Sequence, residues 1–431
     1  MYKAPRGTQD KLPSEQSYWD YVIHKAQELC QLYGYQRLDT PAFEEAGLFR
    51  RSIGEGTDIV EKEMYTFEDH GGDLMTLRPE GTAPVCRAYI EHGMQNLPQP
   101  VRLYYLSPIF RYERPQAGRF RQHHQFGCEA IGDGDPSLDA ELIELSWRLC
   151  ESLGLRDLTF QLNSIGCPEC RPQYLQRLKQ HYANHSEALC QDCKARLVRN
   201  PLRLLDCKKP ICKEISQDAP SISDHLCQTC DTHFHDVQQH LATIGISFNH
   251  NPFLVRGLDY YTRTVFELHP KEEGAQSALG GGGRYDLLIE ELGGKPSPAI
   301  GFATGLERLI INLKRQEVSV PNLDQPAVFV TYLDDRGKIE AVRIASSLRQ
   351  VGIGANTPPG GKSLKAQLKQ ANARGATYAV IVGGEELERG SITIRDLTQG
   401  QQQEVPKEQV MQHLSHLQQG PVNSIQSSVI W

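Results

Sequence analysis

The segment FRYERPQAGRFRQHHQ, which runs from Phe110 to Gln125, constrains the fold of this chain more strongly than any other. Pro115 and Gly118 near its centre favour a reversal of the chain, so the segment predicts a strand, a loop and a returning strand. Such a loop brings its arginines together, and converging guanidinium groups indicate an anionic ligand. A solvated surface is the common alternative for a charged run. The segment contains the arginines Arg111, Arg114, Arg119 and Arg121.

The composition of the 431-residue chain limits its partners. A length of this order predicts about three domains. The formal net charge is -7, which argues against nucleic-acid binding driven by charge alone. The N-terminal residues MYKAPRGTQDKLP lack the apolar core of a secretory signal, and no apolar run approaches the about 18 residues of a membrane span. We therefore expect a cytoplasmic protein with no membrane partner.

Residues 1–166 have the pattern of an α+β domain. Apolar side chains from Trp19 to Tyr33 follow helical spacing, and Gly34 stands at the position of a helix stop. In the segment SLDAELIELSWRLCESLG, Ser137 precedes a second apolar row with helical spacing, formed by Ala140, Ile143, Trp147 and Cys150. The segments VRLYYLSPIFRYE and QFGCEAIG, which flank the arginine loop, have the character of strands. Strands without regularly alternating helices predict a largely antiparallel sheet.

The composition changes between residues 167 and 245, which hold eight of the twelve cysteines and helix-like segments. Without a secretory signal, these cysteines indicate thiols or metal ligands rather than disulfides. Three CxxC pairs and one wider pair could build two sites of four thiolates, each for a structural zinc ion. Buried small apolar side chains or reduced surface thiols are the alternative. The eight residues are Cys167, Cys170, Cys190, Cys193, Cys207, Cys212, Cys227 and Cys230.

Strand character returns in residues 246–318. The segment LVRGLDYYTRTVFEL predicts a strand, the glycine-rich LGGGGRYD follows, and AIGFATGLERLIINL predicts a strand that enters a helix. Gly301, Ala303 and Gly305 alternate along that strand, so a ligand could lie close to its backbone, although tight packing alone also explains small residues. Arg308 in the following helix could bind a phosphate or stack on a base.

The segment LMTLRPEGTAP holds Glu80 and Thr82 between two prolines. A carboxylate and a hydroxyl on a stiff loop suit recognition of an ammonium group, whereas an ordinary surface turn is the alternative.

Residues 326–420 alternate between strand and helix patterns, which predicts an α/β domain with parallel strands. We expect the preceding segment NLKRQEVSVPNLDQP to be a linker and the final residues QQGPVNSIQSSVIW to be loosely held.

Taken in order, these segments resemble the three signature motifs of class II aminoacyl-tRNA synthetases. The motifs are a Pro-ended strand at LDTP, the FRYE strand with its loop and returning strand, and the small-residue strand before the ER helix. LVRGLDYYTRTVFEL and GGGGRYD resemble the two histidine-specific signatures of the histidyl-tRNA synthetase family. The resemblance implies a class II catalytic core on a mainly antiparallel sheet, with a helical cysteine-rich insertion and a C-terminal α/β anticodon-binding domain. The implied boundaries are 1–166 and 246–318 for the core, 167–245 for the insertion and 326–420 for the last domain.

The resemblance also implies an activity, that of a histidine–tRNA ligase. The carboxylate of L-histidine attacks the α-phosphate of ATP to give histidyl-adenylate and pyrophosphate, and histidine then moves to the 3′ end of tRNA(His). The implied substrates are therefore L-histidine, ATP with Mg²⁺, and tRNA(His). A homodimer with the LDTP region at its interface is implied as well. The extra 5′ guanosine of the tRNA is expected near Gln116 and Arg121.

The implied ATP site explains the cluster of arginines. Arg111 is expected at the α-phosphate, Arg119 and Arg308 at the triphosphate, and Glu113 near the adenine. Fixed cations at the reacting phosphorus stabilise the charge of the transition state more than that of the ground state. His123, which stands where relatives often have Phe, is expected to stack on the adenine.

The implied histidine site places Glu129 and Tyr261 at the two imidazole nitrogens, with Tyr260 beside them. Arg256 is expected at the α-phosphate, in place of a metal ion used by related enzymes, and is with Arg111 the implied catalytic residue. The alternative for Arg256 is a merely structural pair with a carboxylate such as Asp259. The implied histidine-binding residues are Glu80, Gly81, Thr82, Arg111, Gln125, Glu129, Arg256, Tyr260 and Tyr261.

Two other functions compete with this interpretation. A non-catalytic paralogue, such as the regulatory subunit of an ATP phosphoribosyltransferase, tends to lack the anticodon-binding domain and to lose signature residues. A zinc-dependent nucleic-acid-binding module would use the insertion as its main site. That module would leave the arginine loop, Glu80, Arg256 and Tyr261 without a role.

Overall fold

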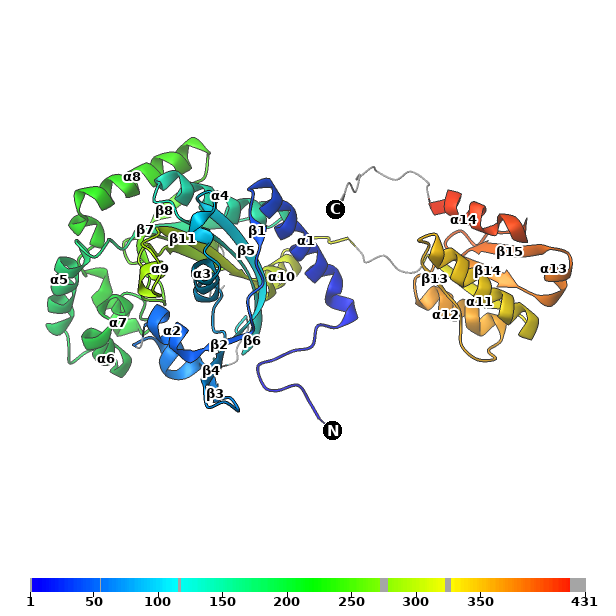
Figure 1. The fold of residues 1–431 in the computed structure, drawn as a ribbon, viewed down its shortest axis with the longest axis horizontal. Helices are drawn as coiled ribbons and strands as arrows, with labels where there is room; N and C mark the ends of the chain where they lie inside the picture. Colours follow the sequence, from blue (N-terminus) through cyan, green and yellow to red (C-terminus); the bar gives the residue numbers. More distant parts are fainter. Residues whose placement is uncertain (1, 55, 115–117, 272–277, 322–326, 419–431) are drawn as a thin grey trace. The chain divides into compact units, whose positions relative to one another are not determined.

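The structure is a computed structural model that describes residues 2–54, 56–114, 118–271, 278–321 and 327–418. The chain divides into two compact units, residues 1–321 and 322–431 (Figure 1). Each unit has its own hydrophobic core. None of the helices in the described ranges combines the length and the apolar character of a membrane span.

An eight-stranded sheet forms the centre of the first unit (Figure 1). The first and second strands in its order pair in parallel, as do the last two, and all other neighbours are antiparallel. The mainly antiparallel sheet expected from the sequence is therefore confirmed. In spatial order the strands are β1 (Gln36–Arg37), β5 (Val101–Phe110), β6 (Gln122–Ile131), β11 (Ala299–Gly305), β10 (Gly280–Arg284), β9 (Thr262–Pro270), β7 (Leu158–Ser164) and β8 (Phe248–His250).

The arginine segment adopts the predicted strand–loop–strand form. β5 and β6 pair along their whole length, from Val101 opposite Ile131 to Phe110 opposite Gln122. The loop between them carries the arginines at the end of the sheet. A separate three-stranded sheet holds β2 (Phe43–Glu45), β4 (Leu74–Leu77) and β3 (Tyr65–Glu68) in that order.

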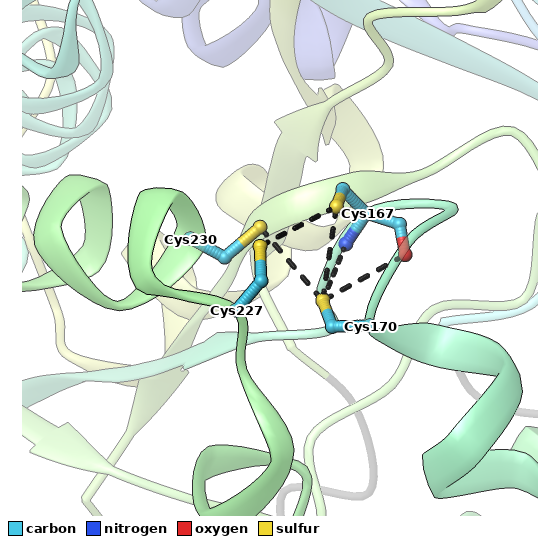
Figure 2. Close-up of side chains that lie close together, drawn as sticks. All are labelled: Cys167, Cys170, Cys227 and Cys230. Carbon is cyan, nitrogen blue, oxygen red and sulfur yellow. Dashed lines mark hydrogen bonds between the residues drawn. The ribbon is translucent and has the colours of Figure 1, made fainter.

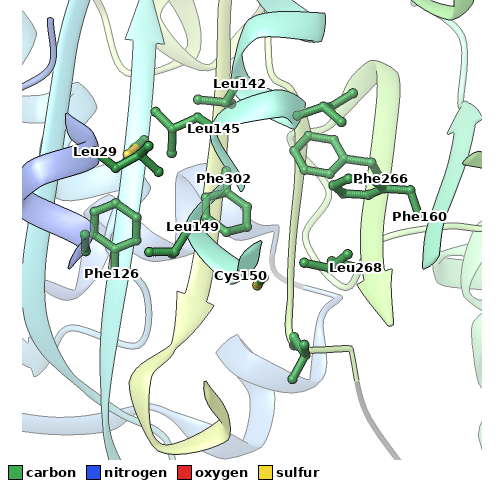
Figure 3. Packing of buried hydrophobic residues seen from close by; sticks show 14 of the residues in the cluster. Leu29, Phe126, Leu142, Leu145, Leu149, Cys150, Phe160, Phe266, Leu268 and Phe302 are labelled. Carbon is green, nitrogen blue, oxygen red and sulfur yellow. The ribbon is translucent and has the colours of Figure 1, made fainter. Parts of the chain in front are cut away.

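Three helices pack on the large sheet and bury its main core. They are α1 (Gln16–Leu32), α4 (Pro136–Ser152) and α10 (Leu306–Arg315). Figure 3 shows Leu29 of α1 and Leu149 of α4 packed with Phe126, Phe266 and Phe302 of three different strands. Burial of each such side chain stabilises the fold by about 1.5–3 kcal/mol, so this core fixes the strands that carry the cleft described below.

The beginning of α4 differs from the sequence-based prediction. Asp135, rather than Ser137, caps the helix, and its side chain accepts a hydrogen bond of 2.8 Å from the backbone N–H of Ser137. The reason is Pro136, which occupies the first helical position, where no N–H donor is needed. The residue before it, Asp135, is therefore the N-cap.

The remaining elements of the core surround the sheet. The short ones are η1 (Pro13–Glu15), α2 (Ala46–Ile53), η2 (Ile59–Glu63), α3 (Thr82–Glu91), η3 (Met94–Asn96) and α9 (Leu288–Glu291). The cysteine-rich stretch is helical, as expected, and contains α5 (Arg171–Ala183), α6 (Gln191–Arg199), η4 (Pro201–Leu204), α7 (Pro210–Gln217), η5 (Ile222–His225) and α8 (Gln228–Thr243). Its buried side chains share one core with those of the large sheet, because Tyr174 and Leu178 belong to the same cluster as Tyr261 and Val265.

Two segments differ from their predicted form. Residues 254–261 form turns instead of the first half of a strand, and β9 begins only at Thr262. The backbone N–H of Asp259 bonds to the carbonyl of Ile53 at 3.2 Å, so it is not available to a neighbouring strand. The predicted linker also begins later than expected, since α10 continues through Arg315.

The second unit has the predicted α/β character. Its sheet has the order β13 (Ala355–Asn356), β12 (Val328–Tyr332), β14 (Tyr378–Val382), β15 (Ser391–Asp396) and β16 (Gln402–Pro406). The first three strands are parallel, but β15 returns antiparallel to β14. The connection of residues 383–390 is too short for a parallel crossover, which needs a dozen or more residues. The helices are α11 (Asp335–Gln350), α12 (Leu364–Ala373), α13 (Gly384–Glu388), η6 (Lys407–Gln409) and α14 (Val410–Gln418).

Candidate active site

A cleft of about 840 Å³ opens in the first unit, on the large sheet. Strands β5, β6, β10 and β11, helix α3 and the turn before β9 contribute to its walls. The structure thus brings together segments that lie far apart in the sequence. The expected site residues that line the cleft are Glu80, Thr82, Arg111, Glu113, Arg119, Gln125, Arg256, Tyr260, Tyr261 and Arg308.

Glu129 lies directly behind the lining, on β6, and is completely buried. Its carboxyl group accepts a hydrogen bond of 2.7 Å from the hydroxyl of Thr82 and one of 2.5 Å from the hydroxyl of Tyr285. Burial raises the pKa of Glu129 to about 8. The carboxyl group of Glu129 therefore retains its proton through most of the range up to neutral pH.

Tyr285 was missed among the candidate site residues. The signal was present, because Tyr285 is the tyrosine of the GGGGRYD segment, directly after β10. Its partner Glu129 lies 156 residues earlier in the chain. No local pattern links the two positions, since the contact exists only once β6, β11 and β10 are neighbours.

Glu80 is a second buried carboxylate, and the first turn of α3 fixes its orientation. Its two oxygens accept hydrogen bonds from the backbone N–H groups of Thr82 at 2.7 Å and Ala83 at 2.8 Å. Burial raises the pKa of Glu80, while these two N–H donors act in the opposite direction. A carboxylate held at a helix N-terminus in this way can orient a ligand cation without moving.

Two glycines make room for these groups. A Cβ atom on Gly81 would lie 2.3 Å from the ring of Tyr105, and one on Gly301 would lie 1.8 Å from a carboxylate oxygen of Glu129. Gly81 therefore acts through the backbone. The alternation of small residues along β11 thus has a steric cause at Gly301.

Aromatic rings enclose the polar floor of the cleft. The ring centroid of Tyr260 lies 4.7 Å from that of Tyr261 and 5.7 Å from that of Tyr285. Two buried polar atoms, the hydroxyl of Tyr105 and Oε1 of Gln125, have no hydrogen-bond partner among the described residues. Unpartnered buried polar groups are costly, so they indicate a polar ligand at this end of the cleft.

The arginines at the other end are held by backbone carbonyls. Nε of Arg111 donates to the carbonyl of Pro79 at 2.6 Å. Arg308 donates from Nε to Gly118 at 3.2 Å and from Nη1 to Ala278 at 2.8 Å. Burial lowers the pKa of Arg308, which indicates a guanidinium that is short of compensating charge. Cations that are already fixed in place in this way fit a polyphosphate.

Arg119 and Glu113 form a looser pair across the same loop. Nε of Arg119 lies 3.6 Å from Oε2 of Glu113, and this oxygen has no hydrogen-bond partner among the described residues. Both side chains can therefore turn toward a ligand at little cost.

Arg256 does not contact Asp259, the carboxylate considered as its partner from the sequence. Nη1 of Arg256 instead forms an ion pair with Glu267 on β9, whose second oxygen lies 2.8 Å from Nε2 of His269. Asp259 accepts a hydrogen bond of 2.5 Å from Asn200. Nε of Arg256 is buried and has no hydrogen-bond partner among the described residues, so the guanidinium retains a donor for a ligand.

His123 lines the cleft beside these arginines. Burial lowers the pKa of His123 to about 3, and the charges of Arg111 and Arg308 act in the same direction. The ring is therefore neutral at physiological pH and can stack on a base. Arg121 lies 3.8 Å from the ring centroid of Tyr112 and donates to the carbonyl of Glu113 at 3.3 Å, while Gln116 lies outside the described residues.

The eight cysteines of the insertion form two groups of four, and within each group all sulfur atoms lie within 4.8 Å of one another. Figure 2 shows the first group, in which the pair before α5 faces the pair at the start of α8. The second group joins the first turn of α6 to the pair that flanks the start of α7. The groups are Cys167, Cys170, Cys227 and Cys230, and Cys190, Cys193, Cys207 and Cys212.

The spacing of the sulfur atoms tests whether a metal fits. Four thiolates bound tetrahedrally at about 2.3 Å from one zinc ion have sulfur atoms about 3.8 Å apart. In the first group, Cys167 lies 3.8 Å from both Cys170 and Cys227, and Cys170 lies 3.9 Å from Cys230. In the second group, the sulfur atoms of Cys190 and Cys207 are 3.9 Å apart. Both groups therefore have dimensions that can hold a metal ion.

Comparisons with known proteins agree with this arrangement. The family model of histidyl-tRNA synthetase matches residues 7–309, and that of an anticodon-binding domain matches residues 327–417. A histidine--tRNA ligase of Dehalococcoides mccartyi is 57% identical over 95% of this chain and 98% of its own length. That of Halothermothrix orenii is 49% identical over 96% of this chain and 99% of its own.

Solved structures show the same fold. The structure of apo S. aureus histidyl-tRNA synthetase superposes with a TM-score of 0.82 and 37% identity, covering 96% of this chain and 99% of that one. Histidyl-tRNA synthetase from Nostoc sp. PCC 7120 has a TM-score of 0.67 at 20% identity, covering 97% and 100% of the two chains, which supports the fold alone.

Proposed function

The chain belongs to the histidyl-tRNA synthetase family, and from this premise we propose how its cleft residues carry out the reaction of that family. Its activity is the joining of L-histidine to tRNA(His) with the use of ATP. In the first step the histidine carboxylate attacks the α-phosphorus, the bond to the β-phosphate oxygen breaks, and pyrophosphate leaves. In the second step a hydroxyl of the terminal ribose of the tRNA attacks the carbonyl carbon, and AMP leaves.

Arg111 and Arg256 are the proposed catalytic residues. Negative charge increases on the α-phosphate oxygens in the transition state, and cations already fixed there stabilise it without reorganisation. The proposal is supported by the Pro79 carbonyl and the Glu267 carboxylate, which hold the two guanidinium groups in place. Glu267 is thus proposed to orient Arg256 rather than to touch the reactants.

The outer parts of ATP are assigned to three further residues. Arg119 and Arg308 bind the triphosphate, and Glu113 lies near the adenine, beside the neutral ring of His123. ATP is used with Mg²⁺ in this family, and the ion, when bound, neutralises part of the phosphate charge. The carbonyl contacts that hold Arg308 support its assignment as a fixed phosphate ligand.

The imidazole of histidine is proposed to bind between Glu129 and Tyr261. At neutral pH the carboxyl group of Glu129 carries a proton, because burial raises its pKa to about 8. When the imidazole ring of histidine, with an ordinary pKa near 6.5, lies beside this carboxyl group, the opposite charges of an imidazolium–carboxylate pair lower the pKa of Glu129 and raise that of the ring. The proton then moves to the ring, so that both ring nitrogens become donors. One donates to Glu129 and the other to Tyr261. An amino acid without these nitrogens leaves buried polar groups unpaired and is rejected.

The polar end of histidine is assigned to the opposite side of the same pocket. Glu80 and Thr82 bind its ammonium group, with Gln125 beside them, and Tyr260 packs against the ring. The unpartnered Oε1 of Gln125 supports this assignment, because an ammonium group supplies the missing donor.

The Arg256→His variant tests the proposed catalytic role. Loss of one preorganised charge contact costs about 100- to 1000-fold in turnover, or about 3–4 kcal/mol. We expect adenylate formation to slow by this factor, with a smaller change in the KM for ATP and in the transfer of histidine from preformed adenylate to tRNA. Single-turnover measurements of each step check this expectation. Equal losses in both steps, together with a lowered melting temperature, would show a structural role only.

The matched control for this experiment is Arg102→His. Arg102 is also partly buried and paired with a carboxylate, Glu141, at 3.0 Å, but it lies outside the cleft. Both half-reactions of this variant should stay within about twofold of the wild type, because neither Arg102 nor Glu141 lines the cleft.

The alternative of a non-catalytic paralogue leaves two observations unexplained. It predicts the loss of the anticodon-binding domain, yet residues 327–417 match that family. It also gives no role to the two buried carboxyl groups, Glu80 and Glu129. Pyrophosphate exchange measured with each amino acid separates the two functions, since the paralogue supports no exchange.

We also propose that each four-cysteine group binds one structural zinc ion. The support is the match between the sulfur separations and the edge of a zinc–thiolate tetrahedron. The ions would hold the helices of the insertion together and take no part in the chemistry. Elemental analysis of protein purified without added metal should give about two zinc ions per chain. Protein without zinc that keeps its full thermal stability would contradict this proposal.

The proposed assembly is a cytoplasmic homodimer with residues 38–41 at the interface, as the family resemblance implies. Arg78 fixes the LDTP segment by donating to the carbonyls of Thr40 at 2.7 Å and Pro41 at 3.0 Å. This rigidity is suited to an interface, and light scattering of the purified chain measures the mass directly. The extra 5′ guanosine of tRNA(His) is proposed to bind near Arg121 in the arginine loop.

A further inference from the structure

A short stretch of the insertion, residues 196–203, contacts the rim of the catalytic cleft. Nη2 of Arg196 lies 3.2 Å from a carboxylate oxygen of Asp58, and Nη1 of Arg199 lies 2.6 Å from one of Glu61. Both carboxylates belong to the segment around η2, and Asp58 of this segment lines the cleft. One end of α6 is therefore bonded to a wall of the site.

The same stretch also contacts the turn that carries the histidine-specific signature. Nδ2 of Asn200 donates to Asp259 at 2.5 Å, and Nη1 of Arg203 donates to the carbonyl of Gly257 at 3.3 Å. The contacted residues, Gly257 and Asp259, lie in the sequence between Arg256 and the two tyrosines of the turn. Residues 196–203 thus hold two walls of the cleft at once.

The packing of this stretch depends on the second cysteine group. Cys193 is the one residue of α6 whose side chain is buried. An isolated helix of nine residues is not stable in water, and besides Cys193 only Leu197 of α6 packs, partly buried, against the core. The stretch begins three residues after Cys193 and ends four residues before Cys207, so a metal bound by this group would fix the chain on both sides of it.

We propose that the metal of the second cysteine group braces the catalytic cleft. The metal fixes residues 196–203, and this stretch in turn holds the η2 segment and the 256–261 turn in their places. Arg199 and Asn200 are positioning residues, because they act through other residues of the cleft, whereas Arg196 also lines the cleft itself. This inference rests on the proposed zinc sites, but it assigns a role in substrate binding to one site only.

The first cysteine group serves as the internal comparison. It joins the beginning of the insertion to its end, and the adjacent Arg171 donates to the carbonyl of Tyr261 at 2.6 Å. None of the contacts described for the η2 segment comes from this group. Loss of its metal should therefore affect the turn and leave the η2 segment unchanged.

Hydrogen exchange measured by mass spectrometry on the full chain tests the brace without relying on activity. The Cys193→Ala variant should lose one zinc ion and show about tenfold faster exchange at residues 57–63. The contacts from α6 are then already lost, so local opening of these residues no longer has to break them. Cys230→Ala should lose the other ion without this effect. Cys150→Ala removes a buried thiol outside both groups and should keep both ions and the wild-type exchange.

The Asp58→Asn variant tests the contact itself while leaving both cysteine groups intact. It should retain both zinc ions, yet exchange at residues 57–63 should again accelerate, since Arg196 loses its charged partner. In pyrophosphate exchange, Cys193→Ala and Asp58→Asn should both raise the KM for histidine or ATP by more than they lower kcat, as expected when binding surfaces lose their position.

The outcomes separate the brace from the zinc sites. A Cys193→Ala protein that has lost its zinc but exchanges residues 57–63 as slowly as the wild type overturns the brace and leaves the zinc sites standing. Wild-type protein that carries no zinc and still protects residues 57–63 overturns both. Chelator treatment of the wild type provides the same comparison if Cys193→Ala does not fold.

Discussion

Substitution of the buried Glu129 by Gln should make the empty enzyme more stable at alkaline pH and less able to bind histidine. Burial raises the pKa of Glu129 from 4.5 to about 8. The folded state therefore holds a proton that the unfolded state has released, and the stability of the wild type falls as pH rises between these two values. A glutamine has the same shape and no such proton, so its free energy of unfolding lacks this dependence.

The size of the effect follows from the shift. Each pKa unit corresponds to about 1.4 kcal/mol, so the full shift amounts to at most about 5 kcal/mol at pH 8 and above. An amide makes weaker hydrogen bonds with Thr82 and Tyr285 than a carboxylate does, by about 1 kcal/mol in all. We therefore expect the free energy of unfolding of Glu129→Gln to exceed that of the wild type by about 2–4 kcal/mol at pH 8 and by close to nothing at pH 5.

Urea unfolding at several pH values, followed by tryptophan fluorescence, measures this difference. Two of the three tryptophans, Trp19 and Trp147, lie in the first unit, and a Trp431→Phe background removes the third, so that the signal reports on the unit that contains Glu129. The control is Glu141→Gln, which removes a partly buried ion pair with Arg102 and should change stability by about 1 kcal/mol or less at every pH. A Glu129→Gln protein that is no more stable than the wild type at pH 8 would refute the reasoning.

The same variant has a functional cost. The imidazole loses a charged acceptor, which corresponds to about 1.5–3 kcal/mol and a rise of about 10- to 100-fold in the Kd of histidine. Isothermal titration measures this constant directly. An unchanged Kd would remove Glu129 from the histidine site, whatever the stability data show.

Three further perturbations follow from the geometry. Gly301→Ala places a Cβ atom 1.8 Å from the carboxylate of Glu129, so histidine-dependent pyrophosphate exchange should fall by about 100-fold or more, while Gly47→Ala, which meets open space, should not change it. A chain that ends at Pro321 retains the complete first unit and should keep pyrophosphate exchange, whereas charging of tRNA should drop sharply; equal loss of both activities would mean that the second unit supports the cleft. His123→Phe exchanges one neutral flat ring for another and should leave the KM for ATP within about threefold, and a larger rise would indicate a polar role for His123.

The elements that the sequence predicted well are those set by neighbours in the chain. Pro115 and Gly118 stand between two runs with the character of strands, and the hairpin of β5 and β6 forms around them. The strand β11 and the helix α10 also follow directly from AIGFATGLERLIINL. Local patterns carry this information because strand and helix periodicity are properties of short segments.

Contacts between distant segments could not be predicted in the same way. The sequence indicated two groups of four cysteines, but it could not show that the first CxxC pair meets the last one, since this depends on the path of four helices. The partner of Arg256 was sought at Asp259 because the two are close in sequence. Residues 254–261 form turns that direct Arg256 toward Glu267 on β9 instead.

The position of β11 between β6 and β10 has a consequence for the synthesis of the chain. When β6 has been made as far as Ile131, its second neighbour is still absent, because β11 begins only at Ala299. At translation rates of about 5–20 residues per second, the strand that carries Glu129 waits roughly 10–30 s with one edge unpaired. An open strand edge of this kind pairs readily with other chains. The nascent first unit should therefore depend on chaperones until residue 305 emerges, whereas the second unit, formed from one continuous stretch, needs no such wait.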